Sequence, residues 1–154
     1  MTRQQLGALF LRRAIRHVEE GFKAKARSAT EDALYHIERA YRLWAASGPA
    51  TSRVESVRWY AHALEASGRF DEVYPLLERE RREHDGENRR WIELFLVSHA
   101  IANPDPNRQR HGNEILAFYL ANTHAIPHGA DELVIAILGI AVSHLPQVIA
   151  TQGL

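Results

Sequence analysis

The sequence predicts an all-α fold built from about seven helices. Ala, Leu, Glu and Arg dominate the composition, and all four favour helices. Apolar residues recur three and four positions apart, as on one face of a helix, and the alternation of β-branched residues that marks a strand is missing. With 154 residues the chain has the size of one domain, long enough to bury about two-thirds of its unfolded surface.

The first helix is expected over residues 3–25, where apolar residues drift around one face. Residues 28–31, Ser-Ala-Thr-Glu, match a capping box, in which the serine hydroxyl meets the N3 amide and the glutamate reaches back. A second helix is therefore expected to open there. It is expected to stop at residues 47–49, because Gly48 supplies a left-handed residue and Pro49 cannot continue a helix.

The third and fourth helices follow closely. Residues 52–55, Ser-Arg-Val-Glu, form a second capping box that predicts the start of the third helix, and Gly68 closes it. The fourth helix is expected over residues 71–83, with Pro75 in its first turn, where a missing amide costs little.

Three further helices are expected in the second half. They cover residues 87–102, 113–124 and 131–150. The segment Asn-Pro-Asp-Pro-Asn at 103–107 predicts the one real loop, because it carries two prolines and two asparagines in five residues. Pro146 is a candidate kink position in the last helix.

A repeat runs through the second, fourth and sixth helices. Each has an acidic residue before an apolar anchor and a large residue four positions after the anchor. The anchors Ala33, Val73 and Ile115 lie 40 and 42 positions apart. A period of this size corresponds to one helical hairpin per unit.

Residues 60–79 resemble the inter-helix portion of a tetratricopeptide repeat. The matching positions are a small residue, an apolar residue three later, the turn glycine, the aromatic after it and a large apolar residue of the second helix: Ala61, Leu64, Gly68, Phe70 and Leu77. The segment departs from the family where Val73 and Glu80 replace alanine and Asp85 replaces the closing proline. The family has a period of about 34 residues, so these units look divergent.

The resemblance implies a short right-handed solenoid of stacked antiparallel hairpins, and a plain seven-helix bundle is the alternative. We expect one domain over 1–154, with units at about 3–48, 51–86 and 87–125 and a C-terminal helix at 131–150. The resemblance also implies a concave groove that binds a peptide or protein. On the best-matching unit, the groove positions are Glu55, Arg58, His62 and Glu65. A solvated helix face would look the same.

The packing has a physical basis that does not depend on a family name. A hairpin cannot bury its own apolar face, so stacking about three of them makes one continuous core. Small residues let paired helices approach closely, and aromatic residues fill the gaps between pairs. The small positions are Gly21, Ala33, Ala40 and Ala61.

Charge is balanced overall but uneven along the chain. There are 19 basic and 19 acidic residues, so the domain-wide basic excess typical of nucleic-acid binding is absent. Residues 1–60 nevertheless hold eleven basic and six acidic side chains, a net charge of +5. The candidate basic face is Arg12, Arg13, Arg16, Lys23 and Lys25. It could meet phosphates, face an acidic protein or simply be solvated.

The C-terminal helix is apolar all round between Leu133 and Val142. The pure apolar run is too short for a spanning helix, which needs about 20 residues, so we expect no membrane partner. Burial or self-association is expected instead. The candidate self-association residues, for a homodimer or a partner site, are Leu133, Ile137, Ile140 and Val142.

Other chemistries find little support. The chain has no cysteine, which fits a reducing compartment, and we expect it to be cytoplasmic. His124 and His128, with Asp131, could share a metal, but Pro127 favours a turn with two exposed histidines, and we expect no metal or cofactor. No phosphate-binding loop or nucleophile motif occurs. The sequence therefore predicts a non-catalytic protein-interaction or scaffolding module; a regulatory protein that contacts nucleic acid through the basic N-terminal half is the alternative.

Overall fold

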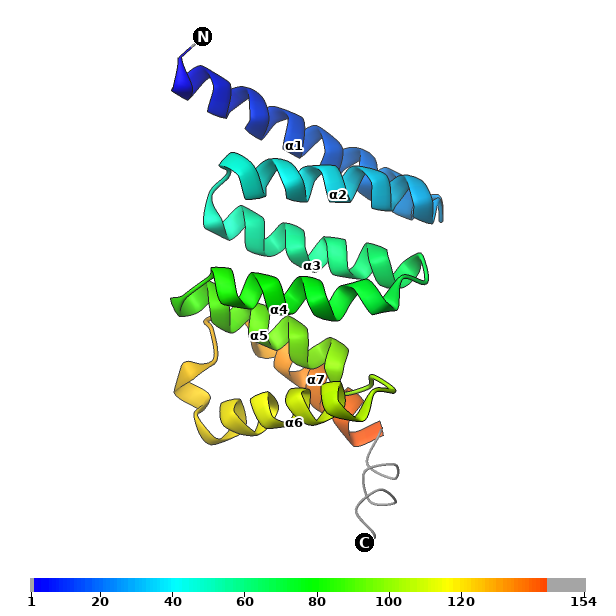
Figure 1. Cartoon of the computed structure of the whole chain (residues 1–154), viewed down its shortest axis with the longest axis vertical. Helices are drawn as coiled ribbons and strands as arrows, with labels where there is room; N and C mark the ends of the chain where they lie inside the picture. Colours follow the sequence, from blue (N-terminus) through cyan, green and yellow to red (C-terminus); the bar gives the residue numbers. More distant parts are fainter. Residues whose placement is uncertain (1, 144–154) are drawn as a thin grey trace, which may run out of the picture. The chain divides into compact units, whose positions relative to one another are not determined.

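The structure, a computed structural model, describes residues 2–143, apart from the side chains of Arg3 and Ser47. This part of the chain contains seven α-helices, two short 3-10 turns and no strand, which confirms the all-α prediction (Figure 1). The elements are α1 (Arg3–Ala26), α2 (Thr30–Ser47), α3 (Ala50–Ala66), η1 (Phe70–Glu72), α4 (Val73–Glu83), α5 (Gly86–Ala100), α6 (Pro106–Ala121), η2 (Thr123–Ala125) and α7 (Asp131–Ser143).

The chain divides into two compact units, residues 1–76 and 77–154, with the boundary inside α4. The first unit holds α1, α2, α3 and η1, and the second holds α5, α6, η2 and α7. The expected right-handed solenoid extends over both units and stays a prediction, as does the single domain.

In the first unit, α2 lies between α1 and α3 (Figure 1). The core of the α1–α2 contact is made by Ala14, Ala40 and Trp44, all buried. Trp59 of α3 packs against this cluster, with its ring centroid 6.2 Å from that of Trp44. Small residues on α1 and α2 therefore bring the helices together, and large rings join them to α3.

Gly21 marks a close approach between α1 and α2. A Cβ added at this position would stand 2.7 Å from Cγ1 of Ile37. No real side chain fits at that distance without a shift of its neighbour, because protein interiors are close-packed. The prediction that small residues permit close helix pairing is confirmed here.

In the second unit, α5 contacts both α6 and α7. Gly112 of α6 plays the part that Gly21 plays in the first unit, because a Cβ there would lie 2.8 Å from the Cβ of Ala100 on α5. Ile137 is the fully buried residue of α7, and Ile92 and Leu96 of α5 are also fully buried. The apolar face of α5 thus forms much of this unit's core.

The predicted capping box at residues 28–31 is wrong. Ser28 lies beyond the end of α1, where it adopts a left-handed conformation with φ of 59°. The amide of Ala29 donates to the carbonyl of Ala24 at 2.9 Å, and the amide of Ser28 donates to Lys25 at 3.0 Å. This pair of bonds is the Schellman termination of α1, so Ser28 ends one helix instead of capping the next. Helix α2 has no side-chain cap.

The second predicted capping box, at residues 52–55, is also wrong. Helix α3 begins at Ala50 directly after the extended Pro49, and the amide of Arg53 donates to the carbonyl of Pro49 at 3.1 Å. Ser52 therefore already lies inside the first turn. Gly48, expected to be left-handed, has an extended backbone with φ of −91°. Gly68 does close α3 as predicted, with φ of 75° in a second Schellman termination.

Helix α6 begins seven residues earlier than predicted. The Asp105 side chain accepts hydrogen bonds from the amides of Asn107 and Arg108, and Pro106 occupies the first helical position. Proline is well suited to that position because its missing N–H needs no partner there. The predicted loop is thus confirmed at residues 103–105, whereas Pro106 and Asn107 belong to α6. The end of the predicted 131–150 helix, with Pro146, lies outside the described residues.

Candidate functional site

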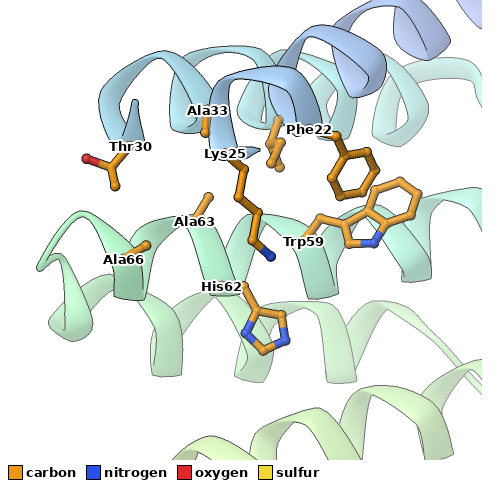
Figure 2. A pocket seen from close by; sticks show the side chains of 9 residues that line it. Phe22, Lys25, Thr30, Ala33, Trp59, His62, Ala63 and Ala66 are labelled. Carbon is orange, nitrogen blue, oxygen red and sulfur yellow. The ribbon is translucent and has the colours of Figure 1, made fainter. Parts of the chain in front are cut away.

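A pocket of about 80 Å³ opens on the first unit between α1, α2 and α3 (Figure 2). Its lining is mainly apolar. The residues that line it are Phe22, Lys25, Thr30, Ala33, Ile37, Trp59, His62, Ala63 and Ala66. Sites for drug-sized ligands have volumes of about 300–1,000 Å³, so this pocket suits part of one apolar side chain and not a cofactor.

The pocket exists because rings and small residues lie on opposite sides of it. Phe22 packs edge-on against Trp59, with ring centroids 5.2 Å apart and planes at 79°. Trp59 is also held by Trp44 at 6.2 Å, so the indole is fixed on one side. On the other side, Ala33 and Ala63 are too small to fill the space in front of the rings. The alternation of large and small residues leaves a preformed apolar cavity.

Two nitrogen-bearing side chains stand at the edge of the pocket. Figure 2 shows Lys25 reaching from α1 toward His62 on α3. Lys25 has no ion pair within residues 2–143, and Nδ1 of His62 lies 3.9 Å from a carboxylate oxygen of Glu65. An exposed ammonium beside an apolar cavity favours a ligand with an apolar group next to a negative one.

The predicted groove residues occupy one stripe of α3 at intervals of three and four. Glu55, Arg58 and His62 are exposed, whereas Glu65 is half-buried. Of the four, His62 lines the pocket. Arg58 and Glu65 already have partners within the chain. A ligand that bound either side chain would have to replace those partners. The other lining residues from α3 are Trp59, Ala63 and Ala66, which the sequence analysis did not assign to a site. The spacing of alanines opposite an aromatic pair was the available signal.

The predicted basic face is not one stripe of α1. At about 100° per residue, Arg12, Arg13, Arg16 and Lys23 lie within an arc of about 100°, and Lys25 lies about 120° away from Arg13. The contacts agree, because Lys25 lines the apolar pocket and Arg13 lines a different one. Lys23 is partly neutralised by Glu20 at 3.5 Å. An extended polyanion would therefore not meet all five cations together.

The predicted self-association residues of α7 point in different directions. Ile137 is fully buried, so it belongs to the core and not to a surface; this corrects the sequence-based assignment. Leu133 and Ile140 are half-buried, and Val142 is exposed. The exposed apolar stripe of α7 is made instead by Ile135, Leu138 and Val142. Self-association through α7 stays a prediction.

The second unit has an open cleft of about 680 Å³ that sequence reasoning missed. Glu93 is one of its lining residues: it accepts a hydrogen bond from the Tyr119 hydroxyl at 3.2 Å and pairs with Arg89 at 3.0 Å. Burial, together with the charge of Glu93 and this hydrogen bond, raises the pKa of Tyr119 far above its ordinary value. Arg81 lies 3.7 Å from the same carboxylate. The carboxylate of Glu93 is therefore satisfied within the chain.

Neither metal binding nor membrane insertion gains a structural basis in the described part of the chain. His124 lines the cleft of the second unit, and His128 is exposed. Among residues 2–143, no group of three or more His, Asp or Glu side chains is placed to hold a metal ion. None of the helices there combines the length and apolar character that a membrane crossing requires.

Comparison with known proteins yields no relative. The chain matches no model of a known protein family, no curated protein and no solved structure. The resemblance of residues 60–79 to a tetratricopeptide repeat therefore stays a prediction from the sequence.

Proposed function

We propose that this chain is a non-catalytic protein-interaction module whose first unit binds a short peptide. The pocket beside Trp59 accepts part of one large apolar side chain, and Lys25 and His62 attract an acidic group next to it. The observation that supports this proposal most is the preformed apolar cavity at the edge of the predicted groove, with an unpaired ammonium at its mouth. Preformed pockets bind well because little ordering is required of the protein.

The size of the pocket favours a peptide ligand over a small-molecule ligand. Its volume of about 80 Å³ is far below that of a typical small-ligand site. The remaining affinity must therefore come from contacts along the exposed surface of α1 and α3, where Phe22 is 40% exposed and Glu55 is accessible. Peptides that bind helical surfaces combine one or two apolar anchors with charges at the rim in this way.

Selection from a random peptide display library on the immobilised full chain tests the proposal. We expect enriched peptides with a large apolar residue next to Asp or Glu. The Ala66→Leu variant fills the pocket from its edge, and Lys25→Glu reverses the charge at its mouth; each is expected to weaken binding of the selected peptides about tenfold or more. Ala46→Leu, at an exposed position of α2, and Lys23→Glu, two residues from Lys25, are the matched controls.

Two results would contradict the proposal. One is a set of selected peptides without a common apolar and acidic pattern. The other is equal binding by Ala66→Leu and Ala46→Leu, because the pocket would then contribute nothing. Circular dichroism at 222 nm of each variant separates lost binding from lost folding.

A further inference from the structure

A second pocket, of about 270 Å³, lies on the α1–α2 hairpin and carries only positive or neutral side chains. It is lined by Arg13, His17, Arg39, Arg42 and Leu43. Nothing in the lining is acidic. Three guanidinium groups and an imidazole around one open pocket raise the local positive potential, because a concave site focuses the field of its walls.

Two of the three arginines have no carboxylate partner. Arg42 is paired with Glu38, whose carboxylate lies 2.6 Å from Nη2. Arg13 and Arg39 make no ion pair within the part of the chain that the structure describes. Arg39 is held by stacking on Tyr35, with its Cζ 3.7 Å from the ring centroid. The pocket therefore presents about two uncompensated charges on positioned side chains.

A histidine pair adds a titratable element to the pocket. Nδ1 of His17 lies 3.0 Å from Nδ1 of His36, so one ring donates a hydrogen bond to the other and at least one must be neutral. Burial lowers the pKa of His17 below its ordinary value of 6.5, and the charges of His36, Arg39, Arg13 and Arg16 lower it further. These four are the charged groups that α1 and α2 direct at His17. A bound anion would reverse the charge effect and favour protonation.

We infer that this pocket binds a phosphate monoester dianion. A monoester carries a charge of about −1.5 to −2 near pH 7 and offers three acceptor oxygens, which match the two uncompensated arginines. Guanidinium groups recognise such oxygens through paired, charge-assisted hydrogen bonds. A single group is favoured over a nucleic acid because the cations surround one pocket, whereas a polyanion would need them in a row.

The inferred anion site is separate from the proposed peptide pocket. It uses residues of α1 and α2 that do not line the pocket at Trp59. Loss of anion binding and loss of peptide binding can therefore be told apart, because Arg39→Gln is expected to leave the peptides selected by the full chain bound as before.

The test is a titration of the full chain with phenyl phosphate and with sodium sulfate. Binding is monitored through the imidazole NMR signals of His17 and His36. Arg39→Gln is expected to weaken both ligands about tenfold or more, and Arg39→Lys to weaken them less, because it keeps the charge and loses the planar fork. Arg110→Gln, at an exposed position of α6, is the matched control and is expected to change nothing. A wild-type chain whose histidine signals do not move at tens of millimolar of either ligand would overturn the inference.

The pH dependence of sulfate binding reports protonation of the protein alone. Sulfate remains a dianion between about pH 5.5 and pH 8, whereas histidine titrates in that range. We expect sulfate to bind more tightly at the lower pH. His17→Gln is expected to bind sulfate with much weaker pH dependence. An unchanged pH dependence in that variant would remove His17 from the site.

Two more ligands test where the monoester comes from and whether the ligand is a polyanion instead. A phosphotyrosine peptide that binds more tightly than phenyl phosphate would assign the group to a protein side chain, and equal affinities would assign it to a small molecule; both results support a monoester site. A single-stranded oligonucleotide that binds more tightly than either, with a steep loss of affinity in salt, would overturn it in favour of a polyanion.

Discussion

Replacing Gly21 with alanine tests the close contact between α1 and α2 at this position. The added Cβ would lie 2.7 Å from Cγ1 and 3.4 Å from Cδ1 of Ile37, with the carbonyl oxygen of Ala33 at 3.6 Å. Ile37 is buried, and its branched Cβ restricts rotation about χ1, so its Cγ1 has little room to move away. The helices must separate slightly or Ile37 must leave its preferred rotamer.

Two effects of known size oppose each other at this position. Overpacking a close-packed core costs about 1–3 kcal/mol. Alanine in place of glycine inside a helix gains about 1 kcal/mol. The net expectation is that Gly21→Ala lowers the free energy of unfolding by about 0–2 kcal/mol. We expect a destabilisation because the clashing atom is the inner carbon of a buried side chain.

Urea unfolding followed by circular dichroism at 222 nm measures this change. Gly7→Ala and Gly139→Ala are the controls, since a Cβ at Gly7 or Gly139 meets no atom within 4 Å. Both controls are expected to stabilise the chain by up to about 1 kcal/mol. If Gly21→Ala stabilised the chain as much as Gly7→Ala, the close approach of α1 and α2 would be refuted.

A double-mutant cycle with Ile37→Ala identifies the clashing partner. Ile37→Ala alone is expected to cost about 2–5 kcal/mol, because it leaves a cavity in the core. In that background the Cβ of alanine at position 21 no longer meets Cγ1, so Gly21→Ala should become stabilising. A cycle without coupling would mean that the cost at Gly21 arises elsewhere.

Three further predictions concern pH, capping and α7. His17 binds its proton more weakly in the folded chain than in the unfolded one, so its contribution to stability is present above about pH 6.5 and lost as the pH falls. His17→Gln should therefore reduce the fall of the urea midpoint at acid pH. An equal fall in the variant and the wild-type chain would contradict this. Asp105→Ala should cost about 1 kcal/mol in urea unfolding, since it removes the α6 cap, whereas Asp85→Ala, at a start with no side-chain cap bond, should cost less; equal losses would refute the capping argument. Ile137→Asp should unfold the second unit as seen by circular dichroism, whereas Val142→Asp should leave stability intact because Val142 is 64% exposed. Light scattering of Val142→Asp then reports whether α7 self-associates. A mass equal to that of the wild-type chain would remove Val142 from the self-association surface.

Helix existence was predictable from the sequence, and so were the starts at Arg3 and Asp131, whereas the starts that depended on a predicted cap were not. All seven predicted helices occur, because apolar spacing and the turn glycine at Gly68 are local signals. The starts at Thr30 and Ala50 were missed because Ser28 and Ser52 match a capping motif equally well whether or not the chain turns there. The Schellman termination of α1 decides the role of Ser28, and it depends on backbone conformation.

The candidate sites were predictable only in part. The sequence places His62 on an exposed stripe of α3 and Lys25 on α1, but it does not indicate that both line one cavity. It also treats Arg13 and Lys25 as one basic face, whereas they line different pockets. Pockets form between helices, so their membership depends on how each helix is rotated against its neighbours.

The sequence by itself determined the all-α class, the seven helices found within residues 2–143 and the close approach of two helices at Gly21. These properties follow from local propensity and from apolar periodicity, which act within one or two turns. Only the tertiary structure decided that Ile137 is core and not surface, that His17 meets His36, and that Trp59 and the alanines opposite it leave a cavity. Each of these depends on contacts between helices far apart in sequence, where burial and charge are set by the neighbour and not by the residue.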